Sequence, residues 1–148
     1  MRHFQNRPGI SFNLEQQLSA DLGVFVRAGI ADGSREPFEF TDIDRTFAAG
    51  LAISGKLWGR PNDTLGAAGI VNGISTVHEE FLNADGPGIL LGDGKLPNPG
   101  AERIFETYYS FPVLSWRATA DYQFVDNPAY NQGRGPVNVV GTRLRAQF

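Results

Sequence analysis

Residues 137–148 read VNVVGTRLRAQF, and this stretch decides the fold. Side chains alternate between the two faces of a β-strand, so residues two apart share a face. One face of this stretch becomes apolar towards its end and closes on an aromatic residue: Asn138, Val140, Thr142, Leu144, Ala146 and Phe148. The opposite face is polar and cationic, and carries Gly141, Arg143, Arg145 and Gln147. Such a strand is typical of an outer-membrane barrel, where lipid meets one face and water the other.

The same alternation predicts six further strands upstream. They cover residues 10–18, 22–30, 45–57, 64–74, 102–111 and 114–125. The alternation is clearest in the strand 114–125, where Trp116 and Phe124 share one face and Arg117 and Asp121 share the other. The glycine- and proline-rich segment 75–101 is predicted to be a long irregular loop. Antiparallel strands with no predicted helix place the chain in the all-β class.

The connections between these strands alternate strictly between short turns and long loops. Outer-membrane barrels have short turns on the periplasmic side and long loops outside. Trp58, Tyr109 and Trp116 are predicted to face outward as anchors at the membrane interface. The predicted fold is therefore an antiparallel transmembrane β-barrel of the outer-membrane porin type, of which this chain supplies about seven strands.

The strand count bears on domain organisation. Bacterial single-chain barrels have an even number of strands, and lipid does not tolerate an open sheet edge. The basic start MRHFQNRPG is followed by a polar segment rather than by the apolar core of a signal peptide. We therefore expect residues 1–148 to be the C-terminal part of a single barrel domain, with a signal peptide and an odd number of strands upstream.

Composition argues against several other classes of protein. The net charge of −3 offers no basic surface for nucleic acid. Cysteine is absent, which excludes a disulfide framework, a thiolate zinc site and a cysteine nucleophile. His78 precedes two glutamates but lacks the second histidine of a zinc protease motif, so it is expected to be a solvated loop residue. We expect neither an enzyme nor a bound cofactor or metal.

Several segments of the chain resemble the OprB-type carbohydrate-selective porins. The similarity is carried by LEQQL and DLGVFVRAG at 14–18 and 21–29, WGRPNDTLGAAGIVNGIS at 58–75, IFETYYSF at 104–111 and ADYQFVDNPAYNQGRGPVNVVGTRLRAQF at 120–148. The most specific part is a Tyr-Gln strand, then an Asn-Pro loop, then a closing R-x-R-x-x-F strand. The resemblance implies a barrel of about sixteen strands that passes sugars across the bacterial outer membrane, with this chain as its C-terminal portion.

The polar faces of the predicted strands supply the candidate site, because they would line the lumen. The candidate pore-lining residues are Glu15, Arg27, Glu106, Arg117, Asp121, Arg143 and Arg145. Arginine forks suit the oxygens of sugar hydroxyls, and neighbouring acids can hold them in place. The alternative is that these side chains form ion pairs that only stabilise the wall between adjacent strands.

Counting outward from the loop 126–136 predicts how the last two strands pair. Arg117 falls opposite Arg145, Thr119 opposite Arg143, and Asp121 opposite Gly141. Three arginines then share a small area of wall with one aspartate, which gives this patch a surplus of positive charge. Asp121 is expected to hold at least one of the arginines in place.

The leading hypothesis is a passive pore that admits sugars down a gradient. Lipid is expected to surround its apolar face, and the outer-membrane assembly machinery is expected to recognise the last strand through Phe148. The runner-up is a small soluble antiparallel barrel or sandwich that binds a ligand. The two differ in which face is buried, because in the soluble protein the apolar face would be the core.

Overall fold

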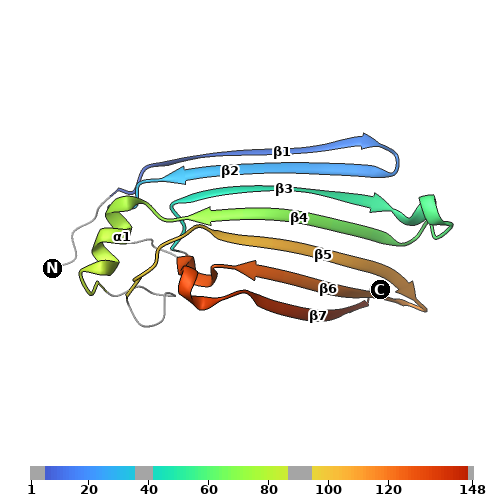
Figure 1. Cartoon of the computed structure of the whole chain (residues 1–148). Helices are drawn as coiled ribbons and strands as arrows, with labels where there is room; N and C mark the ends of the chain where they lie inside the picture. The colour runs from blue at the N-terminus through green and yellow to red at the C-terminus, as the bar shows by residue number, and fades with distance from the viewer. Residues whose placement is uncertain (1–5, 36–41, 87–94, 147–148) are drawn as a thin grey trace.

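A computed structural model gives the structure of the chain and describes residues 6–35, 42–86 and 95–146. Seven antiparallel strands form one sheet, in which each strand pairs with its neighbours in sequence (Figure 1). The strands are β1 (Gly9–Ser19), β2 (Leu22–Ala31), β3 (Arg45–Ser54), β4 (Thr64–Gly73), β5 (Glu102–Val113), β6 (Trp116–Asp126) and β7 (Val137–Ala146). The predicted all-β class and the seven predicted strands are confirmed. No helix in the described ranges is long and apolar enough to span a membrane.

The register of the last strand pair is the predicted one. Arg117 pairs with Arg145, Thr119 with Arg143, and Asp121 with Gly141. Residues paired across neighbouring strands point to the same face of the sheet. The registers of all six strand pairs therefore place most polar residues of the strands on one face and most apolar residues on the other. The sheet therefore has an apolar face and a polar face, as the period of two predicted.

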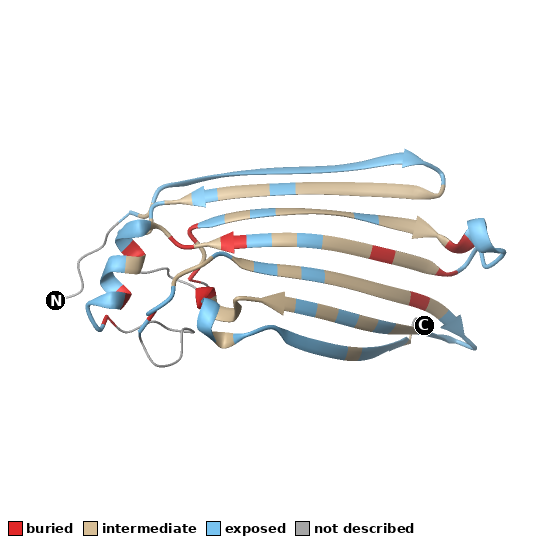
Figure 2. Ribbon diagram, viewed as in Figure 1, coloured by how far each residue is buried: buried red, intermediate tan, exposed pale blue. Residues whose placement is uncertain are grey.

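No described element covers the apolar face. Phe12, Val140 and Leu144 on that face are 57%, 79% and 70% exposed. The buried apolar residues form one cluster instead: Ile74, Leu82, Leu96 and Tyr130. Leu82 belongs to the helix α1 (Thr76–Asn83), and Figure 2 shows buried segments in red at the end of the sheet next to this helix. A soluble sandwich would bury the apolar face under a second sheet. Within the described residues, this arrangement argues against the soluble alternative.

Within the described ranges, three strand ends differ from the predicted ones by two residues or more. β3 stops at Ser54 instead of Leu57, because the Ser54 side chain accepts the Lys56 N–H and begins the 3-10 helix η1 (Gly55–Trp58). β5 continues through Pro112 to Val113, where a turn was predicted, and β6 begins only at Trp116. The two residues between them form the turn, with Leu114 at a φ of 55°.

The turn between β3 and β4 is built around Asp63. This buried carboxylate accepts hydrogen bonds from Arg60 Nε and from the Tyr109 hydroxyl. The Trp58 indole N–H donates to the same hydroxyl at 3.1 Å, and its ring centroid lies 6.3 Å from that of Tyr109. Phe111 extends the group, 6.0 Å from Tyr109. Trp58, Tyr109 and Phe111 therefore form an aromatic group at this end of the sheet.

The opposite end, which we call the loop end, carries the described parts of the connections 32–44, 74–101 and 127–136. Residues 75–101, predicted to be irregular, contain the helix α1 (Thr76–Asn83). Ser75 caps this helix, since its Oγ accepts the His78 N–H at 3.2 Å. Leu82 anchors the helix in the buried cluster with Ile74, Leu96 and Tyr130. A helix of two turns leaves too short a pattern to be recognised in the sequence.

Asp44 ties three segments together at the loop end. Its buried carboxylate forms a salt bridge with Arg7, accepts the Ser75 N–H at 2.7 Å and lies 3.1 Å from His78 Nδ1. A Cβ on Gly33 would come within 2.3 Å of Asp44 Oδ2, so only glycine fits beside it. The prediction of a solvated His78 was wrong: α1 turns this side chain onto Asp44, and the residue is 8% exposed.

The partners of Asp44 also set its ionisation. Burial by itself would raise the pKa of Asp44, but the Ser75 N–H, His78 and Arg7 together outweigh burial and hold the pKa below its usual range. A carboxyl group with a depressed pKa contributes stability above its unfolded pKa of 3.8, and that stability is lost as the pH falls through the folded value. The loop end is therefore held by an ionised, buried aspartate.

Two aromatic rings on the polar face pack directly on glycines of the next strand. A Cβ on Gly66 would lie 2.2 Å from the Tyr108 ring, and a Cβ on Gly50 would lie 2.5 Å from the Phe25 ring. Phe25 is paired with Gly50 in the sheet, and Tyr108 is paired with Gly66. Each ring therefore packs on the glycine directly opposite it on the neighbouring strand. On the apolar face of β4, a Cβ on Gly69 would meet nothing within 4 Å.

Replacing Asp44 with Asn should loosen the loop end at neutral pH. The substitution leaves Arg7 without its anion, and we expect a loss of about 2 kcal/mol in the local stability of α1. Hydrogen exchange of the α1 amides, compared between variant and parent at the same pH, measures this loss. The difference should shrink as the pH falls below the unfolded pKa of 3.8, and it should vanish once the pH lies below the depressed pKa of Asp44 in the folded parent. Glu80→Gln, at an exposed position of α1, is the control; equal effects of the two would contradict this account.

Gly66→Ala should destabilise the sheet, because the added methyl group forces the Tyr108 ring off the wall. Overpacking of this kind costs about 1–3 kcal/mol. Gly69→Ala in the same strand meets open space and should be neutral. Urea unfolding of the intact protein in detergent micelles measures both changes. If Gly66→Ala and Gly69→Ala unfolded at the same urea concentration, the Tyr108 ring would not rest on Gly66.

Candidate functional site

The seven predicted pore-lining residues all lie on the polar face of the sheet. The registers of the six strand pairs place them there: Glu15, Arg27, Glu106, Arg117, Asp121, Arg143 and Arg145. Glu15 and Arg27 lie on β1 and β2, and the other five lie on β5, β6 and β7. The structure therefore divides the predicted set into two groups, separated by β3 and β4.

The first group is a hydrogen-bonded cluster around Arg27. Its Nη2 donates to Glu15 Oε1 at 2.7 Å, and its Nε donates to Asn13 Oδ1 at 3.1 Å. The guanidinium also lies 5.3 Å from the centroid of the Phe25 ring, within the range of a cation–π contact. Both charged side chains are more than half exposed, so the pair contributes little to stability.

In the second group, Arg117 is held by neutral oxygens. Its Nη2 donates to the Asn62 carbonyl at 3.2 Å, and its Nη1 lies 3.4 Å from Ser110 Oγ. Thr119 donates to the same Ser110 oxygen at 3.1 Å. Arg117 thus leans towards the turn between β3 and β4 rather than towards Asp121.

The other two arginines of this group extend from the wall. Arg143 and Arg145 are exposed, and neither makes a hydrogen bond or ion pair with any residue that the structure describes. Asp121 lies over Gly141, and Glu106 is within electrostatic reach of both Asp121 and Arg143. The predicted hold of Asp121 on an arginine is thus not seen as a salt bridge among the described residues. The guanidinium donors of Arg143 and Arg145 are available to a solute.

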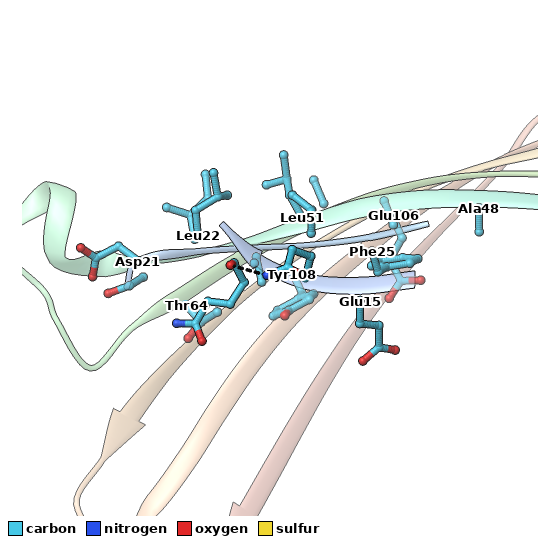
Figure 3. A pocket seen from close by; sticks show the side chains of 18 of the residues that line it. Glu15, Asp21, Leu22, Phe25, Ala48, Leu51, Thr64, Glu106 and Tyr108 are labelled. Carbon is cyan, nitrogen blue, oxygen red and sulfur yellow. Dashed lines mark hydrogen bonds between the residues drawn. The ribbon is translucent and has the colours of Figure 1, made fainter. Parts of the chain in front are cut away.

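A hollow of about 780 Å³ lies on the polar face between the two groups. Its floor consists of small side chains on the middle strands, among them Ala48, Ala52 and Ala68. Figure 3 shows Phe25, Tyr108 and Thr64 pointing to this side of the sheet, while Leu22 and Leu51 point to the other. The sequence offered one signal of this hollow: the small residues of 48–52 and 66–69, which weakened the alternation without ending the strands.

Near the loop end, a row of hydrogen bonds crosses the polar face from β3 to the last loop. Thr46 donates to Asn72 Oδ1 at 2.8 Å, and Asn72 donates to Glu102 Oε1 at 3.3 Å. Glu102 Oε2 then accepts the Ala129 N–H at 3.0 Å, which fixes the loop that contains η2 (Pro128–Tyr130). Burial and the nearby carboxylates Glu102, Asp42 and Asp44 raise the pKa of Tyr130 above its ordinary value. The row therefore serves to seat this loop.

In the parts of the chain that the structure describes, no three side chains of His, Asp or Glu gather as a metal site would require. His78 contacts Asp44 and lies 3.9 Å from Asp42, but the Asp44 carboxylate is already bound by Arg7 and by the Ser75 N–H. The chemistry offered by the described surface is that of a polar wall with hydrogen-bond donors and acceptors.

The comparisons with known proteins agree with this geometry. The model of the OprB family of carbohydrate-selective porins matches residues 2–148. The fold is similar to that of OprB from Pseudomonas putida in a structure determined at high pH, with a TM-score of 0.75 and 20% sequence identity. That match covers 95% of this chain and 35% of the other, so the chain spans about a third of that protein. No curated protein sequence matches the chain.

The family match extends over nearly every residue of the chain, and the structural match shows the same strand arrangement independently. The sheet therefore has the architecture of a porin barrel wall. The chain belongs to the OprB family of carbohydrate-selective porins, proteins of the bacterial outer membrane.

Proposed function

We propose that the chain forms part of the wall of a pore through which sugars diffuse passively. The observation that carries this proposal is the pair of unlike faces on a single sheet. Large apolar side chains stand exposed on one face, and arginines and carboxylates on the other. Lipid stabilises the first face and water the second, which is the arrangement of a barrel around an aqueous lumen. Membership of the OprB family supports sugars as the solutes.

We further propose that residues 1–148 are the C-terminal part of a longer barrel. In the described sheet, β1 pairs only with β2, and β7 pairs only with β6. Each backbone group left unpaired in lipid costs several kcal/mol, so both edges need further strands to close the wall. The length of the P. putida protein, of which this chain spans about a third, supports this proposal.

The two groups on the polar face take different roles in this proposal. Arg27 is engaged by Glu15 and Asn13, as expected of a residue that stabilises the wall. Arg143 and Arg145 extend from the opposite side of the sheet and have donors to offer to the hydroxyl oxygens of a passing sugar. Together with Arg117, they give this part of the lumen a positive potential that disfavours small cations.

The apolar face and the last strand define the other partners. Trp58, Tyr109 and Phe111 form an aromatic group at the short-turn end, where we propose that they meet the membrane interface. The assembly machinery of the outer membrane is proposed to recognise the last strand through Phe148, which lies outside the described residues. No cofactor and no energy source enter this function.

Replacing Arg117, Arg143 and Arg145 together with glutamine should slow sugar entry and shift ion preference towards cations. The change keeps polar side chains but removes three positive charges, and we expect sugar-driven liposome swelling to fall roughly two- to fivefold. The reversal potential of the pore in a salt gradient reports the ion preference. The control replaces Arg45 and Arg103 with glutamine, because both lie on the apolar face.

If the triple variant had the swelling rate and the reversal potential of the parent, the three arginines would only stabilise the wall and would not guide solutes. An equal effect in the control variant would show that net charge, rather than the lumen patch, sets the preference. Failure of the parent protein to admit any sugar into liposomes would contradict the proposed function itself.

A further inference from the structure

We infer that the hollow over β2–β5 is a binding site for the ring of a sugar, with Tyr108 as the platform on which the ring stacks. This inference rests on the proposed pore function and adds to it a specific residue and a mode of recognition. Three of the predicted pore-lining residues, Glu15, Arg27 and Glu106, line this hollow, whereas Arg117, Arg143 and Arg145 do not.

The Tyr108 ring packs against the wall above Gly66. Gly66 is buried beneath it, and any side chain at that position would collide with the ring. The ring lines the hollow, and no aromatic or cationic side chain in the described residues contacts it. Phe25, the other ring in the hollow, already has Arg27 as a cation–π partner. Tyr108 therefore offers to the lumen an aromatic ring that packs on Gly66 and has no other aromatic or cationic partner in the described residues.

The surroundings of Tyr108 match the two kinds of surface on a sugar ring. A pyranose has a flat face of C–H groups, which an aromatic face attracts, and a rim of hydroxyl groups. The hollow supplies carboxylates from Glu15 and Glu106, the Thr64 hydroxyl and the Arg27 guanidinium around its edge. A combination of an apolar platform with a few polar groups is typical of small-molecule sites.

The floor of the hollow leaves room for such a ligand. Ala48, Ala52 and Ala68 stand where larger side chains would fill the space above β3 and β4. The resulting volume of about 780 Å³ lies in the range of small-ligand sites, roughly 300–1,000 Å³. A neutral ligand suits the site better than an anion, because its lining carries three carboxylates, Glu15, Asp21 and Glu106, and one guanidinium, that of Arg27.

The experiment measures glucose binding inside the intact pore, reconstituted in planar bilayers. Glucose in the pore reduces the ion current, and titration gives a half-saturating concentration. Tyr108→Leu removes the flat face and should raise that concentration about three- to tenfold. Tyr108→Phe keeps the face and should stay close to the parent. Tyr122→Leu, on the apolar face of β6, should have no effect.

A second variant tests the site without changing Tyr108. Ala48→Leu fills the floor of the hollow and should weaken glucose binding, whereas Ala49→Leu projects from the apolar face and should not. Sorbitol, an acyclic polyol, has no ring face to stack. Its block of the parent should be weaker than that of glucose and should not change in Tyr108→Leu.

Single-channel conductance in salt identifies variants that assemble as the parent does. The inference would be overturned if Tyr108→Leu and Ala48→Leu both bound glucose with the half-saturating concentration of the parent. It would also be overturned if Tyr108→Leu and Tyr108→Phe weakened glucose binding equally. In either case the parent still admits sugar in swelling assays, so the pore function stands. A parent that admits no sugar refutes the pore function instead.

Discussion

A sheet that crosses lipid must pair its backbone N–H and C=O groups with other strands, because no water is present to replace a missing partner. This constraint explains why the chain uses long antiparallel strands in simple sequential order. It also fixes the register, since a shift by one residue would turn Arg143 and Arg145 into lipid and Leu144 into water. The division between apolar and polar faces follows directly from this pairing.

The parts of the chain outside the ladder serve to hold its two ends and to shape its inner face. At the loop end, an ionised Asp44 joins Arg7, Ser75 and His78, next to a small apolar cluster. At the short-turn end, Asp63 performs a similar role with Arg60 and Tyr109. Between them, small residues on β3 and β4 leave a hollow in a wall that large side chains would otherwise fill.

The strands, their faces and the β6–β7 register could be predicted, because they depend on the alternation of neighbouring residues and on loop length. Helix α1 could not, since only two turns of it exist and tertiary contacts of Leu82 hold it. The burial of His78 depends on Asp44, thirty-four residues away, so no local pattern reveals it. The Tyr108 platform was missed for the same reason: it exists only because Gly66 stands beside it on the next strand.

The central claim is that the polar face meets water and the apolar face meets lipid. Single cysteines are placed at Thr142, Arg143, Leu144 and Arg145 in an intact protein that is otherwise free of cysteine, as residues 1–148 already are. In the intact pore, a charged, membrane-impermeant thiol reagent should label positions 143 and 145 rapidly and alter the current, and should leave 142 and 144 unmodified. Positions 142 and 144 should react with a lipid-soluble maleimide. Equal labelling of all four positions by the charged reagent, or faster labelling of 142 and 144, would contradict the account.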